Sequence, residues 1–161
     1  MTSIEDRIAA LGLYLPEPAR VPDGVVIDFA WARQFGDRVL ISGHGPQAPD
    51  GTILGPFGRV GAEVTPEQAM EAARLATLAM IASAKRTIGT LDRVVAWLRV
   101  DGYVLTAPGF DRTTNIINAG SKLIVELFGK SVGQHARTAM GVAATPLSCP
   151  VVLGAEIVVR K

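Results

Sequence analysis

The chain has 161 residues, of which 48% are hydrophobic and 19% are charged, and its net charge is +1 from 16 basic and 15 acidic residues. A chain of this length and composition forms one domain with a sizeable core, which excludes intrinsic disorder. The near-neutral charge lacks the basic excess of a nucleic-acid-binding protein, so no nucleic-acid partner is predicted.

Residues 1–24 are predicted to form an N-terminal arm, followed by a single domain over residues 25–161. Ser3 is placed to cap a short helix over residues 4–11, and Gly12 follows its end. The start of the chain is acidic where a signal peptide is basic, and no apolar run reaches the roughly 18 to 20 residues that span a bilayer. We therefore expect a soluble, cytoplasmic protein without a membrane partner.

The stretch from residue 25 to residue 46 predicts a β-hairpin. Two runs rich in Val, Ile, Phe and Trp flank the turn pair Gly36-Asp37. The loop 44–64 that follows is rich in glycine and proline and long for a compact domain, which favours a functional task for it.

Two long helices are predicted after this loop. The first ends at Gly89, and its apolar side chains cover so much of its circumference that it must be buried on more than one side. Its N-cap, first-turn and capping-box residues are Thr65, Pro66 and Gln68. The second helix is an apolar stripe with i, i+3, i+4, i+7 spacing over residues 116–128, and Gly129 ends it.

Three further strands are predicted over residues 91–105, 136–144 and 151–159, the first of them with an irregularity at Asp101-Gly102. Helices between strands predict right-handed crossovers that cover one face of a mixed sheet, an α+β two-layer sandwich. The other face would be bare, and an apolar bare face is usually hidden in an oligomer.

Most catalytic patterns are absent. His44 and His135 are the two histidines, and neither lies near a second candidate ligand, so no metal site is predicted. The glycine-rich run 51–61 matches neither a phosphate-binding loop nor a dinucleotide fingerprint, and no cofactor is predicted. Cys149 is the single cysteine and is predicted to be inert, and Ser42 lacks the elbow motif of a nucleophile.

Arg137 lies in a small, apolar, strand-like stretch, "QHARTAMGVAATP", residues 134–146. It could pair with Glu156 or another carboxylate across neighbouring strands, or it could face water. Alternatively, a rigid strand could present its guanidinium to a substrate carboxylate through two parallel hydrogen bonds. The residues alone leave these alternatives open.

The stretches "RVLISGHGP", "LRVDGYV" and "HARTAMGVAATP", together with the long helix after Thr65, resemble the Rid (reactive intermediate deaminase, YjgF-like) family. The closest group within it is the longer-chain one labelled endoribonuclease L-PSP, and the resemblance covers about residues 20–160. It implies a chorismate-mutase-like fold and a homotrimer whose sheets pack into a central barrel with three clefts between subunits.

The resemblance also implies a ligand site. It places the ligand against Arg137, Ser42, Gly43, His44, Asn118 and Ala139. In the family the arginine binds the carboxylate of 2-imino or 2-oxo acids, and the Ser-Gly backbone borders the ligand. Asn118 also shares a polar helix face with Asn115 and Lys122, so solvated surface is the alternative for it.

The chain departs from the family at two positions. Family members that hydrolyse imines have a cysteine where this chain has Ala139 and a glutamate near the position of Val152. Glu156 lies four residues on, on the same face of a regular strand, and could replace that acid or pair with the arginine. The family's aromatic residue near the first strand corresponds to Phe29 or Trp31.

Three functions are therefore expected as alternatives. The first is hydrolytic deamination of small enamines or imines in an inter-subunit cleft, with Arg137 and Glu156 as the catalytic residues, preorganised donors and no cofactor. The second is a non-catalytic module that binds small carboxylates, which Ala139 and Val152 favour. The third, ribonuclease activity, follows only from the family label, and the near-neutral charge opposes it.

Overall fold

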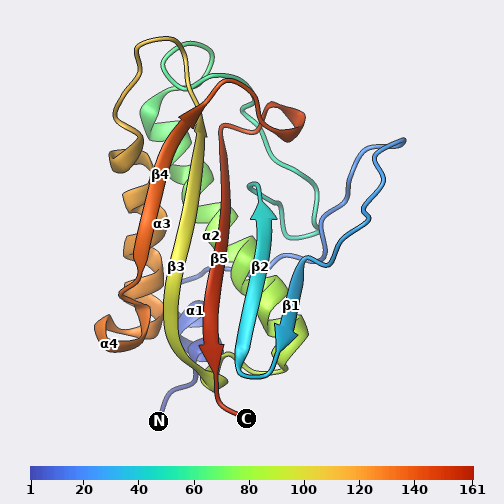
Figure 1. Ribbon diagram of the computed structural model, residues 1–161, viewed down its shortest axis with the longest axis vertical. Coiled ribbons are helices and arrows are strands. Elements are labelled where there is room, and N and C mark those ends of the chain that lie inside the picture. The colour runs from blue at the N-terminus through green and yellow to red at the C-terminus, as the bar shows by residue number, and fades with distance from the viewer.

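The protein, described by a computed structural model over residues 1–161, has two layers, a five-stranded sheet and the helices behind it (Figure 1). The strands are β1 (Ala32–Phe35), β2 (Arg38–His44), β3 (Val94–Leu105), β4 (Ala136–Val142) and β5 (Val151–Val159). The helices are α1 (Ile4–Ala10), α2 (Pro66–Ile88), α3 (Thr113–Phe128) and α4 (Lys130–Gly133), with 3-10 turns at Leu91–Arg93 and Pro146–Ser148. The predicted α+β class is confirmed.

The sheet is mixed and its strand order is β1-β2-β5-β3-β4. Only β3 and β4 pair in parallel, with α3 as the connection between them, and the other neighbours are antiparallel. β5, the last strand in the chain, therefore lies at the centre of the sheet, and β4 forms one edge.

The core lies between the sheet and the two long helices. Alternate residues of β5 are buried toward the helices, from Val151 to Val159, as the period of two requires. α2 and α3 pack closely because Gly120 has no side chain: a Cβ atom there would lie 2.6 Å from the hydroxyl oxygen of Thr77. This close contact fixes the position of α3, which faces the edge strand β4.

The caps that the sequence predicts are present. The amide of Gln68 donates to the Thr65 hydroxyl (3.1 Å), and the Thr65 amide donates to the Gln68 side chain (3.0 Å). Gly89 follows α2 with a φ of 88°. α3 begins earlier than expected, after Arg112, which makes no side-chain cap. Without a capping residue there, the sequence carried no signal for that start.

The predicted hairpin is wrong in its first half. Only residues 32–35 pair with β2, and residues 25–31 leave the sheet. The register of β2 against β5 shifts between Ile41 and His44, because Ser42 and Gly43 form a β-bulge there. A bulge turns the strand, so β2 presents no regular edge to the preceding residues.

The irregularity expected at Asp101-Gly102 is also wrong. β3 pairs with β5 without interruption from Arg99 to Val104. Gly102 serves packing instead, since a Cβ atom there would lie 2.7 Å from side-chain atoms of Ile117.

The face of the sheet away from the helices is bare and mixed in character. Leu40 and Met140 are more than half exposed on it, beside the ion pair of Arg38 with Glu156 and that of Arg99 with Asp101. None of the helices combines the length and apolarity needed to cross a membrane.

Candidate functional site

Arg137 lies on the edge strand β4 and its side chain points to the helix side of the sheet. Its register partner on β3 is Val100, which is buried. One terminal nitrogen of the guanidinium donates to Asn118 Oδ1 (2.8 Å) and to Ser121 Oγ (3.0 Å), and the other donates to the Thr114 carbonyl (3.4 Å). α3 therefore fixes the guanidinium in place.

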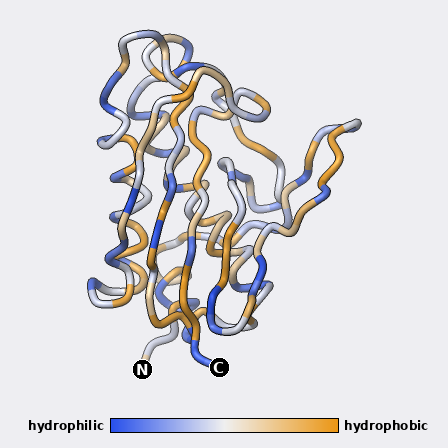
Figure 2. Tube along the Cα trace, viewed as in Figure 1, coloured by the Kyte–Doolittle hydropathy of each residue, from blue (hydrophilic) through white to orange (hydrophobic).

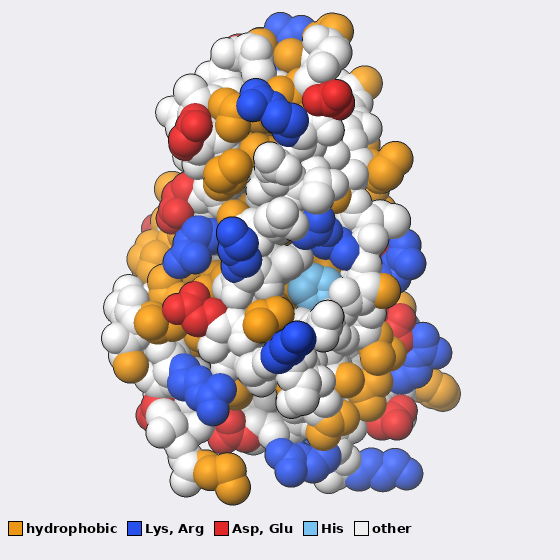
Figure 3. Space-filling view, turned by 90° about the vertical axis from the view of Figure 1, so that its left-hand side faces the viewer, with side chains coloured by type: hydrophobic (Ala, Val, Ile, Leu, Met, Phe, Trp, Pro, Cys, Tyr) orange, Lys and Arg blue, Asp and Glu red, His pale blue; other side chains and the backbone are white.

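The positive charge of Arg137 has no counterion. No carboxylate lies within ion-pair distance of it, and burial lowers the pKa of its guanidinium. A partly buried charge is costly unless it is paired. Figure 3 shows the side of the molecule on the left of Figure 1, where basic side chains gather around a histidine. The surroundings of this edge therefore favour an anion.

A hydrogen-bonded chain runs from Arg137 to His135. Ser121 Oγ accepts from Arg137, so its hydroxyl proton is free to donate to His135 Nε2, 2.9 Å away. His135 Nδ1 then donates to the Gly133 carbonyl (2.7 Å). Burial, and to a lesser degree the charge of Arg137, lowers the pKa of His135. His135 is thus a neutral imidazole of one defined tautomer. It accepts the hydrogen bond of Ser121, which in turn accepts one from Arg137.

The bulge at Ser42 and Gly43 is held from three directions. Ser42 Oγ donates to the Ala30 carbonyl (2.6 Å), and the Ser42 amide donates to the Trp31 carbonyl (2.9 Å). His44 is buried beneath the bulge, and its Nδ1 donates to the Ser42 carbonyl (2.5 Å). His44 therefore supports the bulge from inside, and Ser42 and Ser83 occupy both of its ring nitrogens.

The stability of the protein should depend on the neutrality of His44. Burial lowers the pKa of His44 from 6.5 to about 4, while Ser83 occupies its Nε2 (2.8 Å). The unfolded chain then binds the proton more readily, so this stability is complete above pH 6.5 and is lost as the pH falls toward 4. We expect His44 to lower the free energy of unfolding by on the order of 2 kcal/mol between about pH 7 and about pH 5. Urea unfolding at both pH values measures this effect: from the higher to the lower pH, the free energy of unfolding should fall less in His44→Gln than in the wild-type protein. An equal fall in the two proteins would contradict the prediction.

Glu156 points to the bare face of the sheet. Its neighbours Ala155 and Ile157 are buried toward the helices, so Glu156 must point the other way. It forms an ion pair with Arg38 and shares a hollow of about 300 Å³ with Gly43. Of the alternatives for Arg137, the pairing with Glu156 within one chain is therefore wrong, because the two side chains lie on opposite faces.

The candidate residues fall into two groups within one chain. The first group, Ser42, Gly43 and Glu156, lies on β2 and β5. The second, Arg137, Asn118 and Ala139, lies on β4 and α3. β2 and β4 are separated by β5 and β3, which is three strand spacings of about 4.8 Å, or about 14 Å. A single chain therefore does not bring the two groups into one cleft.

Asn118 is not solvated surface, since it is half-buried and bonds to Arg137. Sequence reasoning missed Thr114 and Ser121, although with Asn118 they follow the i, i+4, i+7 spacing of one helix face.

The residues around the bulge are apolar or unreactive. Burial raises the pKa of the Cys149 thiol to about 11, which keeps it protonated at neutral pH. Val152 lies against Gly43, where a Cβ atom would be 3.0 Å from it. Phe29 and Trp31 meet edge to face with ring centres 4.9 Å apart. None of these side chains offers an acid or a nucleophile.

Residues 5–157 match the family model described as "YjgF/chorismate_mutase-like, putative endoribonuclease". Protein TCP17 of Trypanosoma cruzi is 31% identical over 155 residues, which cover 94% of this chain and 93% of that protein. Two crystal structures each match 98% of this chain. One is Atu1372 of Agrobacterium tumefaciens, a protein of unknown function (28% identity, 92% of that chain, TM-score 0.85). The other comes from Shewanella oneidensis and is described as a putative endoribonuclease (27% identity, 99% of that chain, TM-score 0.88).

Proposed function

The chain belongs to the YjgF/chorismate mutase-like family, and from that premise we propose that it hydrolyses small 2-imino acids to 2-oxo acids and ammonia. The observation that carries the proposal is the guanidinium of Arg137, partly buried, oriented by three hydrogen bonds and without a counterion. A carboxylate that bound there would pair this charge through its two oxygen atoms.

The reaction site would be formed by two protomers of a cytoplasmic homotrimer. Arg137 and the bulge lie about 14 Å apart in one chain, too far for one small acid to contact both. Arg137 on the edge strand of one protomer would hold the carboxylate, and Gly43 and Glu156 of the next would border the C=N group. The hollow that Gly43 and Glu156 share on the bare face supports this division.

The chemistry needs only water and proton transfer. Water adds to the C=N carbon: a C–O bond forms, the C=N π bond breaks, and the nitrogen takes up one proton from the water, which gives a carbon that bears a hydroxyl and an amino group. The hydroxyl proton then passes to the nitrogen, the C–N bond breaks, ammonia leaves and the carbonyl forms. Glu156 lines the hollow beside Gly43 and would take the proton from the attacking water. Fixed hydrogen-bond donors would stabilise the charge that develops on nitrogen.

A non-catalytic module that binds small carboxylates is the second candidate. One observation favours it: both carboxylates in the hollow beside the bulge are engaged in ion pairs, Glu156 with Arg38 and Asp101 with Arg99. This module would keep the Arg137 anchor without the hydrolysis.

The test is ammonia release from freshly generated 2-iminopropanoate, with the wild-type protein and Glu156→Gln side by side. Acceleration by the wild-type protein and a lower rate for Glu156→Gln are expected. No acceleration, while pyruvate still raises the melting temperature of both proteins, would establish the binding module. If the protein neither accelerates release nor responds to pyruvate, the proposed function is wrong.

A further inference from the structure

A projecting segment, residues 21–31, leaves the body of the protein and returns to β1 (Figure 1). It is apolar over much of its length, as the hydropathy colouring shows (Figure 2). Val26 is 74% exposed and Phe29 is 52% exposed. Nothing in a solvated loop requires such side chains, so the segment has an apolar surface to cover or a ligand to contact.

Beneath the projecting segment lies a cavity of about 420 Å³, here called the apolar pocket. Its walls include Val25, Ile27, Phe29 and Trp31 from the segment, with Leu147 and Val152 opposite them. The volume is within the range of small-molecule sites and would hold on the order of ten waters at about 30 Å³ each. Water against such walls is readily displaced by an apolar group.

The polar side chains in the wall are already engaged. His44 has both ring nitrogens in hydrogen bonds and is neutral near pH 7. The amide nitrogen of Gln47 donates to the Glu17 carbonyl (3.2 Å) and lies 3.4 Å from the Gly51 carbonyl. No charged side chain lines the pocket. Its recognition must therefore depend on apolar contact.

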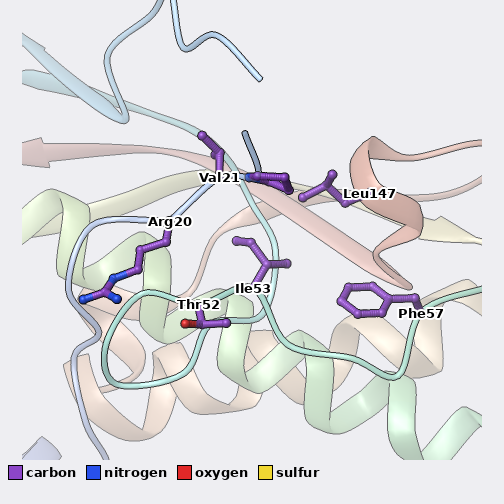
Figure 4. Close-up of a pocket in the computed structure, with 7 residues that line it drawn as sticks. Arg20, Val21, Thr52, Ile53, Phe57 and Leu147 are labelled. Atoms are coloured by element: carbon purple, nitrogen blue, oxygen red, sulfur yellow. The ribbon is translucent and has the colours of Figure 1, made fainter. Parts of the chain in front are cut away.

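The apolar surface continues into a second hollow of about 380 Å³ (Figure 4). Val21, Ile53 and Leu147 belong to both hollows. Leu147 has a φ of 57° and the next residue a φ of 56°, a left-handed conformation that is uncommon for residues other than glycine. Such backbone strain concentrates at ligand sites, where the rest of the structure maintains it.

Gly43, beside which the proposed function places the reacting group, is part of the wall of the apolar pocket. We propose that this pocket takes a branched aliphatic or aromatic substituent of the substrate, so that the preferred 2-imino and 2-oxo acids carry a bulky apolar side chain. The inference rests on the proposed function for the binding of the ligand's carboxylate. The binding of its apolar side chain is inferred from the pocket alone.

The test measures dissociation constants for pyruvate and 4-methyl-2-oxopentanoate by calorimetry. Each buried methyl or methylene group should tighten binding about fourfold, so three added carbons should give about 60-fold. Ile27→Ser, outside the core, should remove most of this preference and leave pyruvate binding unchanged. The matched control is Val95→Ser, an exposed position on β3 away from the pocket, which should retain the preference.

Further arms of the experiment separate the two proposals. Equal affinity for both acids would overturn the apolar pocket and leave the proposed function standing. If neither acid binds but the neutral ketone 4-methyl-2-pentanone quenches Trp31 emission, and Ile27→Ser abolishes the quenching, the pocket stands and the carboxylate site fails. Trp31→Phe serves as the silent control for that signal. If Ile27→Ser dissociates the assembly in sedimentation, the pocket is a contact between copies of the chain and the inference is wrong.

Discussion

Replacing Arg137 with alanine is expected to weaken the binding of pyruvate on the order of 1,000-fold. Two hydrogen bonds between a guanidinium and a carboxylate contribute about 1.5 to 3 kcal/mol each, and every 1.4 kcal/mol is a factor of ten. The same loss should appear in kcat/KM for imine hydrolysis, because the carboxylate is held in the transition state as well. Calorimetry and the ammonia assay measure the two effects.

The stability of Arg137→Ala should change in the opposite sense. Arg137 is a partly buried charge without a counterion, so its removal should leave the melting temperature unchanged or raise it. Arg137→Lys keeps the charge but cannot reach Asn118, Ser121 and a carboxylate together, so we expect an intermediate affinity. Arg33→Ala, at an exposed arginine of β1, is the control. Unchanged pyruvate binding in Arg137→Ala would remove the basis of the proposed function.

Gly51→Ala is expected to lower the free energy of unfolding by about 3 kcal/mol. Gly51 has a φ of 90°, and a Cβ atom there would lie 2.1 Å from the Pro18 carbonyl oxygen. The left-handed conformation accounts for about 1 kcal/mol of the loss and the steric overlap for about 2 kcal/mol. In a chain of this length the melting temperature should fall by about 9 °C. Backbone hydrogen bonds from Glu17 to Pro49 and from Arg20 to Gly51 tie the two segments together and should weaken.

Gly24→Ala is the matched control for Gly51→Ala. Gly24 has nearly the same φ, 85°, but no atom lies within 4 Å of the position of its Cβ. Gly24→Ala should lower the free energy of unfolding by only about 1 kcal/mol, which is the contribution of the left-handed conformation alone. Limited proteolysis should cut Gly51→Ala faster near residues 17–22 than the control. Equal losses in urea unfolding would show that the contact with Pro18 has no role in stability.

The helices were predictable because their ends are encoded locally. Thr65 with Gln68, and the glycines at positions 89 and 129, act within a few residues of where they stand. The start of α3 has no capping side chain, so no local pattern could place it. Residues 25–31 look like a strand by composition, yet a strand also needs a partner edge, which depends on a bulge in β2.

The candidate site was predictable in its parts and not in its arrangement. Arg137 stood out as a charge in an apolar strand. Which face it takes depends on the register of β4 against β3, and that register is fixed by contacts distant in sequence. For the same reason the sequence could not show that Glu156 lies on the other face. Helical spacing could have linked Thr114, Asn118 and Ser121, but only with their common partner known.

The central position of β5 has a consequence for biosynthesis. β2 and β3 are not neighbours in the sheet, and each of them pairs with β5, which lies between them. As the chain emerges from the ribosome, the hairpin and the segment from β3 to β4 therefore have unpaired edges and uncovered apolar side chains until β5 has been synthesised. Chains interrupted before residue 151 would keep these edges exposed and would be substrates for chaperones and proteases.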